Sequence, residues 1–378
     1  MPKSTIQQLA EHGQSIWLDY ISRPLLDTGK LKALIDQGLR GMTSNPSIFN
    51  QAIGSSNDYD RKIVELKTKG KTTFEIYDAL TIKDIQDAAD QFKGVFEATK
   101  GLDGYVSLEI NPLLADKIEE QAQEGIRLFD AVKRKNVMIK VPSTDQGFPV
   151  IEELISRGIN VNVTLIFSLA QYEKTVAAYF AGLKRLSKNT NDLSSVRSVA
   201  SVFISRIDST IDKTLDDFIK NEKDATRQSQ LRALKGKAAV ANSRIIFERF
   251  KKLFNGQEFQ ALKSKGANIQ RVLWGSTSTK NPDYSDVKYV TELIASPTVN
   301  TLPEKTLMAF LDHGQVKEAF DYDVKQAEDV VARLKKHNID VNQVCAQLLI
   351  DGVNAFNQAF EELQSTLEKK AEQLSSVN

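Results

Sequence analysis

The strongest constraint on the fold is a regular alternation between short apolar segments and longer segments with helical periodicity. The short segments are bounded by Gly, Pro, Asn and Ser, which is typical of strands. Strands that alternate with helices pair in parallel, because each helix returns the chain to the same edge of the sheet. The expected strands are residues 15–19, 41–43, 104–110, 137–141, 160–167, 198–204, 271–274 and 287–294.

This pattern predicts a (β/α)8 barrel. An open doubly wound sheet is the alternative, but no glycine-rich loop marks the switch point that an open sheet uses. Residues 208–265 are highly charged, helical in pattern and longer than one crossover requires, so we interpret them as a helical insertion after the sixth strand. Residues 341–374 predict a long amphipathic helix packed on the outside. We expect residues 1–378 to form a single barrel domain.

The segment 50–100 is also expected to be helical, with one apolar face turned toward the core. The side chains expected on that face are Phe74, Ile76, Tyr77, Leu80, Ile85 and Phe92.

Composition excludes several classes of protein. The chain has 50 basic and 49 acidic residues, so we expect neither a nucleic-acid nor a membrane partner. A single cysteine, Cys345, argues against a disulfide framework, and the first residues lack an apolar signal core; both favour the cytoplasm. His12, His313 and His337 are scattered, and no dinucleotide or P-loop motif occurs, so we expect no metal and no cofactor.

Polar and aliphatic residues alternate within the expected strands. Positions 160, 162 and 164 are polar, whereas 161, 163 and 165 are aliphatic. Helices cover the outside of a barrel, so the aliphatic side chains must face the helices and the polar ones must point inward. Polar side chains at strand ends then meet at the carboxyl-terminal mouth, where barrel enzymes place their sites. The residues concerned are Asp19, Asn45, Glu109, Lys140, Asn162 and Thr164.

Lys140 lies at the end of a buried strand, where a charged ammonium loses hydration. One use of such a lysine is chemical, because a desolvated lysine can lower its pKa from about 10.4 and attack a carbonyl as a neutral amine. The structural alternatives are an ion pair with Glu109 or an ammonium that reaches back to water. Asp19 could likewise cap a helix, and Asn45 before Pro46 could form an Asx-turn.

Several motifs, in this order, resemble those of transaldolases over the whole chain. They are W-L-D at 17–19, T-S-N-P-S-I-F at 43–49, S-L-E at 107–109, I-K-V-P-S-T at 139–144, N-V-T-L-I-F-S at 162–168 and S-R-I-D at 205–208. The insertion after the sixth strand resembles a longer, bacterial-type subgroup. The resemblance implies a (β/α)8 barrel and a transferase of the pentose shunt that works without a cofactor. The expected reaction moves a dihydroxyacetone unit between sugar phosphates through a lysine Schiff base.

The resemblance also implies catalytic roles. Lys140 matches the Schiff-base lysine, and Asp19 matches the acid–base group that handles the hydroxyl proton during carbon–carbon cleavage. Glu109 and Thr164 match the pair that orients a water molecule. A related branch of aldolases releases free dihydroxyacetone and has Gln where this chain has Glu109 and Tyr where it has Phe203. The resemblance therefore favours transfer of the three-carbon unit to an acceptor over its release.

The binding residues follow from the same resemblance. Asn45 and Asn162 match ligands of the dihydroxyacetone hydroxyls, with Ser201 nearby, and Arg206 matches a phosphate ligand. Many members have A-S-F-R after the seventh strand, whereas this chain has G-S-T-S-T-K-N-P at 275–282, so Lys280 is the expected substitute. Sugar phosphates are the expected partners, for a monomer or a homodimer.

Two other functions fit part of this pattern. A glycoside hydrolase could use Asp19 and Glu109 as its carboxylates, but it would leave Lys140 idle and would need sugar-stacking aromatic residues. A non-catalytic barrel could bind sugar phosphates without turnover.

Overall fold

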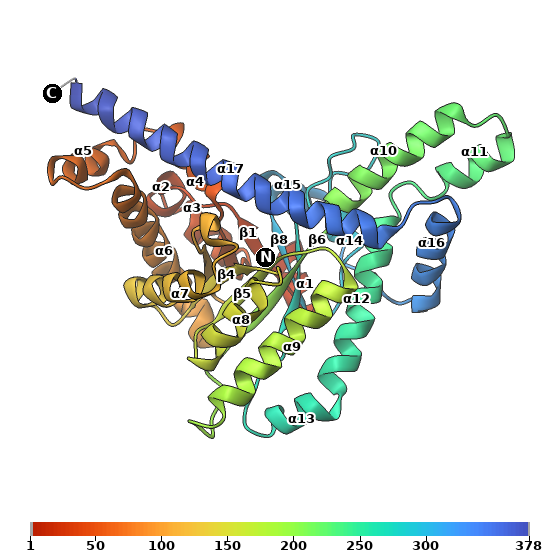
Figure 1. The fold of residues 1–378 in the computed structure, drawn as a ribbon, viewed down its shortest axis with the longest axis horizontal. Coiled ribbons are helices and arrows are strands. Elements are labelled where there is room, and N and C mark those ends of the chain that lie inside the picture. The colour runs from red at the N-terminus through yellow and green to blue at the C-terminus, as the bar shows by residue number, and fades with distance from the viewer. Residues whose placement is uncertain (1–2, 377–378) are drawn as a thin grey trace.

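The computed structural model describes residues 3–376, and its centre is a closed barrel of parallel strands (Figure 1). Each strand is hydrogen-bonded to the next in chain order, and the last pairs with the first, so the (β/α)8 prediction is confirmed. The strands are β1 (Gln14–Asp19), β2 (Gly41–Thr43), β3 (Tyr105–Glu109), β4 (Val137–Pro142), β5 (Val161–Ile166), β6 (Ser198–Phe203), β7 (Arg271–Gly275) and β8 (Thr298–Leu302).

Helices surround this barrel and extend well beyond it (Figure 1). Before β7 they are α1 (Thr5–His12), α2 (Arg23–Asp27), α3 (Lys30–Asp36), α4 (Pro46–Gly54), α5 (Asp60–Thr68), α6 (Thr73–Ala98), the 3-10 turn η1 (Pro112–Leu114), α7 (Ile118–Val132), α8 (Gly147–Ser156), α9 (Leu169–Leu186), α10 (Ser205–Asn221), α11 (Ala225–Arg232), α12 (Ala238–Asn255) and α13 (Gln257–Lys263). After β7 follow α14 (Lys288–Thr291), α15 (Glu304–His313), α16 (Val324–Lys336) and α17 (Val341–Ser376). Helices α10 to α13 confirm the helical insertion after the sixth strand. Within residues 3–376, no helix combines the length and the apolar character needed to cross a bilayer.

The position predicted for the eighth strand is wrong. Residues 287–294 contain the short helix α14, and β8 follows it at Thr298–Leu302. Val290, Leu293 and Ile294 are three or four residues apart and are all fully buried, which is the spacing of one helix face. A short apolar run has no period clear enough to distinguish a strand from a helix, and this one was assigned to the wrong class.

The expected apolar face of α6 is correct except at one residue. Ile76, Tyr77, Leu80, Ile85 and Phe92 are buried, but Phe74 is 36% exposed. Phe74 lies in the first turn of α6, where its ring contacts only the edge of the core through Tyr77 and Phe360.

The barrel interior is layered. Apolar side chains, one from each of six strands, fill its middle: Trp17, Tyr105, Met138, Val199, Leu273 and Val299. Below them, at the amino-terminal end, Arg271 and Asp103 form a buried ion pair of 2.7 Å. The layer above them is polar, as the strand alternation predicted, and it faces the carboxyl-terminal mouth.

Helix α17 has a larger role than the predicted packing on the outside. This 36-residue helix crosses the molecule from α16 to α5 and contacts α4, α6, α10 and β5 on its way (Figure 1). Gly352 allows the close approach, because a Cβ atom there would lie 3.0 Å from the Leu165 side chain. Near the end of α17, Lys370 pairs with Asp60 of α5 at 2.7 Å. The helix therefore covers the carboxyl ends of the strands.

Gly41 provides a test of how the barrel interior is packed. A methyl group at this position would lie 2.7 Å from ring carbons of the fully buried Trp17. We expect Gly41→Ala to reduce the free energy of unfolding by about 1–3 kcal/mol, because the ring has no space to move into. Thermal unfolding of the purified variant measures this loss.

Gly94→Ala is the matched control for this substitution. Gly94 lies within α6 and has no neighbouring atom within 4 Å of the added methyl group. Its replacement should leave stability unchanged or raise it by up to about 1 kcal/mol. Equal unfolding temperatures for the two variants would contradict the packing described for Trp17.

Candidate active site

A pocket of about 290 Å³ lies at the carboxyl ends of the barrel strands. All the predicted site residues except Glu109 lie on the walls of this pocket. Those that line it are Asp19, Asn45, Lys140, Asn162, Thr164, Ser201, Arg206 and Lys280. Glu109 lies behind Lys140 and lines a neighbouring cavity of about 20 Å³.

Lys140 occupies the inner face of β4 and is only 5% exposed. Its Nζ donates to the carbonyl oxygen of Ser44 at 2.9 Å and to Oε2 of Glu109 at 3.1 Å. The predicted ion pair therefore exists, while the alternative of an ammonium that reaches water is wrong. Because Lys140 also lines the pocket, the pair places an amine beside the space for a ligand.

Glu109 is buried on β3, next to Lys140 in the sheet. Burial raises the pKa of its carboxyl, because the charged form loses hydration there. The Lys140 ammonium acts in the opposite direction and lowers this pKa. A carboxyl under these opposed influences is suited to exchanging a proton with the amine.

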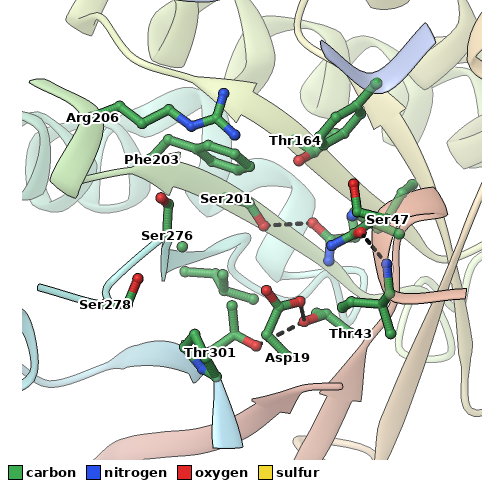
Figure 2. A pocket seen from close by; sticks show the side chains of 18 of the residues that line it. Asp19, Thr43, Ser47, Thr164, Ser201, Phe203, Arg206, Ser276, Ser278 and Thr301 are labelled. Atoms are coloured by element: carbon green, nitrogen blue, oxygen red, sulfur yellow. Dashed lines mark hydrogen bonds between the residues drawn. The ribbon is translucent and has the colours of Figure 1, made fainter. Parts of the chain in front are cut away.

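Asp19 ends β1 and does not cap a helix. Its Oδ1 accepts a hydrogen bond of 2.6 Å from the Thr43 hydroxyl, which itself lies 2.8 Å from the Thr301 hydroxyl (Figure 2). The helix that follows, α2, is capped by Ser22. Burial raises the pKa of Asp19, whereas Lys140 and the Thr43 hydrogen bond lower it. The pocket is thus lined by one carboxyl able to accept and return a proton, while Glu109 lines the neighbouring cavity.

Asn162 and Ser201 are held in fixed orientations. Ser201 Oγ donates to Asn162 Oδ1 at 2.6 Å, and Asn162 Nδ2 donates to Ser107 Oγ at 3.0 Å. All three side chains are buried on the inner faces of their strands. Asn162 and Ser201, which line the pocket, therefore present their polar groups to it in a defined arrangement.

Asn45 combines a structural role with a place in the pocket. Its Oδ1 accepts from the Ile48 amide, three residues on, at 3.0 Å and so caps α4, whereas the alternative of an Asx-turn would bond two residues on. Among residues 3–376, its side-chain amide nitrogen has no hydrogen-bond partner. The cap orients the carboxamide and leaves two N–H donors for a ligand.

Thr164 lies at an irregular point of β5. The register between β5 and β6 shifts between Val163 and Ile166, and Leu165 adopts a positive φ of 60°. Thr164 Oγ1 is buried without a hydrogen-bond partner in the described part of the chain, and no direct bond joins Thr164 to Glu109. A buried hydroxyl without a partner is costly, so this atom is placed to bind a ligand or a water molecule.

Arg206, Ser276 and Ser278 lie together on one side of the pocket (Figure 2). Arg206 is half-buried, and burial lowers its pKa while Asp351 raises it. Neither Arg206 nor Lys280 forms an ion pair or a hydrogen bond with another described residue. The buried Arg271, by contrast, is paired with Asp103. Two cations that form no ion pair with a described residue and line one pocket are suited to binding an anion.

Several residues of the pocket wall were not assigned by sequence reasoning, and four of them show why. Thr43 lies within the T-S-N-P-S-I-F motif and could have been found there, whereas Thr301 was lost with the misplaced β8. Ser276 had no signal beyond the loop sequence, and it adopts a positive φ of 52°. Phe356 of α17 lies with its ring centre 5.6 Å from Lys140 Nζ. No local pattern shows where such a helix docks.

The fold and this site together define a barrel enzyme with a buried lysine, two carboxyls and two cations that form no ion pair with a described residue. Residues 16–367 match the family described as Transaldolase/Fructose-6-phosphate aldolase. A protein named Transaldolase from Trichodesmium erythraeum is 44% identical over 380 residues, covering 100% of both chains. Transaldolase 2 from Nostoc sp. is 44% identical, with 98% of each chain covered, and Transaldolase from Saccharopolyspora erythraea is 40% identical, again with 98% of each covered. The chain belongs to the transaldolase family, and it is a transferase.

Replacing Thr43 should shift the pH dependence of activity. The Thr43 hydroxyl stabilises the charged form of Asp19 and so lowers its pKa. In Thr43→Val the hydroxyl is lost, the Asp19 pKa rises, and a larger fraction of Asp19 is protonated at mildly acidic pH. If Asp19 works as a base, kcat should decline as the pH is lowered, and this decline should begin at a higher pH than in the unmodified protein.

Thr43→Ser is the matched control, because it retains the hydroxyl. Its acidic limb in a profile of kcat against pH should coincide with that of the unmodified protein. Identical limbs for Thr43→Val and Thr43→Ser would contradict the role given to this hydrogen bond.

Proposed function

We propose that this chain transfers a dihydroxyacetone unit from a ketose phosphate to an aldose phosphate through a Schiff base on Lys140. The donor would be sedoheptulose 7-phosphate or fructose 6-phosphate, and the acceptor glyceraldehyde 3-phosphate or erythrose 4-phosphate. The observation that carries this proposal is the buried Lys140 amine beside a pocket with two unpaired cations. We further expect a single cytoplasmic domain, monomeric or homodimeric, that serves the non-oxidative pentose phosphate pathway without a cofactor.

Imine formation begins with the deprotonated Lys140 amine, which attacks the C2 carbonyl of the ketose. Glu109 Oε2, at 3.1 Å from Nζ, is placed to accept a proton from the amine. The carbonyl oxygen then leaves as water after a second proton transfer. The free hydroxyl of Thr164 supports a role in holding that water, since the structure gives it no other partner among residues 3–376.

Carbon–carbon cleavage follows from the charge of the imine. The protonated imine withdraws electrons from C3, so the C3–C4 bond can break when a base removes the C4 hydroxyl proton. Asp19 is the proposed base, and the rise in its pKa through burial suits a group that must later return the proton. The aldose phosphate leaves, and the three-carbon enamine stays on Lys140.

Substrate positioning divides between the two sides of the pocket. Asn45, Asn162 and Ser201 are proposed to bind the hydroxyls of the three-carbon unit, because their amide and hydroxyl groups are already oriented. Arg206 and Lys280 are proposed to bind the phosphate at the opposite end of the sugar. Arg206 can offer two parallel N–H donors, whereas Lys280 acts as a point charge.

The enamine must be kept from protonation by water until an acceptor arrives. Two aromatic side chains serve this purpose in our proposal. Phe356 of α17 lies beside Lys140, and Phe203 lines the pocket with its ring centre 5.5 Å from that of Phe167. Neither ring can hold a water molecule by a hydrogen bond, which favours transfer over release.

Borohydride trapping tests the Schiff base. Reduction in the presence of fructose 6-phosphate should attach the three-carbon unit or the intact sugar to Lys140, which peptide mass mapping detects. Lys140→Arg should give no adduct and lose turnover, because a guanidinium stays protonated. Asp19→Asn should still form the adduct while losing cleavage. An adduct on a different lysine, or none at all, would refute the mechanism.

Phe203→Tyr tests why the enzyme transfers the unit and does not release it. A phenol hydroxyl in the pocket can hold a water molecule near the enamine, so free dihydroxyacetone should form faster from fructose 6-phosphate without an acceptor. Phe203→Leu is the control, since it changes the ring without adding a hydroxyl. If the unmodified protein accumulates dihydroxyacetone over many turnovers, it is an aldolase and our proposal is wrong.

A further inference from the structure

Asp212 joins the helical insertion to the loop that carries Lys280. It lies on α10, the helix whose first turn contains Arg206. Its Oδ1 accepts from the Gly236 amide at 2.8 Å, in the turn before α12. Its Oδ2 accepts from the Tyr284 hydroxyl at 2.6 Å, in the loop between β7 and α14. One buried carboxylate thus links three segments that are distant in the sequence.

Gly236 shapes the surface that receives Tyr284. It has a positive φ of 66°, and a Cβ atom there would lie 2.8 Å from Cζ and 2.9 Å from the hydroxyl of Tyr284. A side chain at this position would therefore displace the tyrosine ring. The turn before α12 is open at the point where the ring packs and its hydroxyl meets Asp212.

The loop between β7 and α14 is closed on itself around Lys280. Thr279 Oγ1 donates to the carbonyl oxygen of Ser285 at 2.8 Å, and the Tyr284 amide donates to that of Asn281 at 3.2 Å. Lys280 thus lies between two residues that are bonded back to the segment 284–285. Fixing Tyr284 restrains the whole turn, and with it the backbone from which the Lys280 side chain extends.

A second carboxylate one helical turn away has the same pattern but a different target. Asp208 accepts from the Ala239 amide at 2.8 Å and from the Tyr289 hydroxyl at 2.8 Å. Tyr289 belongs to α14 and lies outside the turn that holds Lys280. This pair provides a natural comparison for Asp212 and Tyr284.

Lys280 needs such restraint because it is exposed and its side chain is flexible. An ammonium on a four-carbon stem loses conformational entropy when it binds a phosphate, and a mobile loop would add to that loss. Arg206 extends from the first turn of α10, and its guanidinium lies over the Phe203 ring at 5.8 Å. Tying the loop to the same helix restrains the backbone that carries Lys280 relative to the one that carries Arg206 before a ligand binds.

We propose that Asp212 and Tyr284 are positioning residues that hold the Lys280 loop against α10, so that Lys280 and Arg206 bind one phosphate group together. This inference rests on the phosphate role proposed above for those two cations. It also assigns a function to the helical insertion, whose turn at Gly236 completes the support. The insertion thereby contributes to selection of phosphorylated sugars over unphosphorylated ones.

The test is Tyr284→Phe, which removes the hydroxyl and keeps the ring on Gly236. We expect KM for fructose 6-phosphate to rise about tenfold, since the lost bond is made to a charged carboxylate. KM for unphosphorylated fructose and kcat should stay within about twofold, and inhibition by inorganic phosphate should weaken in parallel. Tyr289→Phe makes the same chemical change at Asp208 and should leave the ratio of the two KM values unchanged.

A double-mutant cycle with Lys280→Ala shows whether Tyr284 acts through Lys280. In the Lys280→Ala background, Tyr284→Phe should have no further effect on KM for fructose 6-phosphate. A full additional effect, or an equal rise for both sugars in the single variant, overturns the positioning role. Thermal unfolding of each variant identifies any general loss of stability.

Arg206→Ala distinguishes a failure of the positioning role from a failure of the phosphate site. If it raises KM only for the phosphorylated sugar while Tyr284→Phe changes nothing, the phosphate site stands and the positioning role fails. If Arg206→Ala and Lys280→Ala affect both sugars equally, the phosphate assignment itself fails, and the positioning role fails with it.

Discussion

The burial of the Lys140 ammonium is the interaction on which the rest of the site depends. A charge removed from water costs several kcal/mol unless nearby groups compensate it. Here the compensation comes from Glu109 and from the carbonyl oxygen of Ser44, on the neighbouring strand β3 and just beyond β2. Glu109 lies 3.1 Å from the amine, and in the proposed mechanism it also accepts a proton from it. One contact would then serve both the stability of the ammonium and the chemistry.

The closed barrel makes this arrangement possible. Strands with helices on their outer face have one inner face, and that face must be filled along its whole length. An apolar layer that includes Trp17 and Leu273 fills the middle and separates the polar mouth from the Arg271–Asp103 pair below. The mouth can therefore concentrate polar groups without opening the barrel to water. Asn162 and Ser201 satisfy each other there, which leaves few costly unpaired groups.

Helices outside the barrel complete the site. Helix α17 brings Phe356 beside Lys140 and is tied down at its far end by Lys370. The insertion contributes next to α17, where α10 carries both Arg206 and the carboxylate that receives Tyr284. These elements lie in separate parts of the sequence, yet they meet at the same mouth (Figure 1). Helices outside the barrel therefore supply part of the pocket wall.

The sequence alone was enough to predict the barrel, the inward direction of its polar residues and the family. It could do so because strand alternation has a period of two and shows directly which side chains share a face. Lys140, Asp19 and Asn162 followed from that periodicity and from their places at strand ends. The same reasoning misplaced the eighth strand, because residues 287–294 are too short a run to show whether their period is that of a helix or a strand. Only the tertiary structure decided that Asn45 both caps α4 and lines the pocket, that Phe356 reaches Lys140, and that Tyr284 meets Asp212. These contacts join residues whose neighbours in the sequence carry no mark of the partner, since they depend on how whole helices dock.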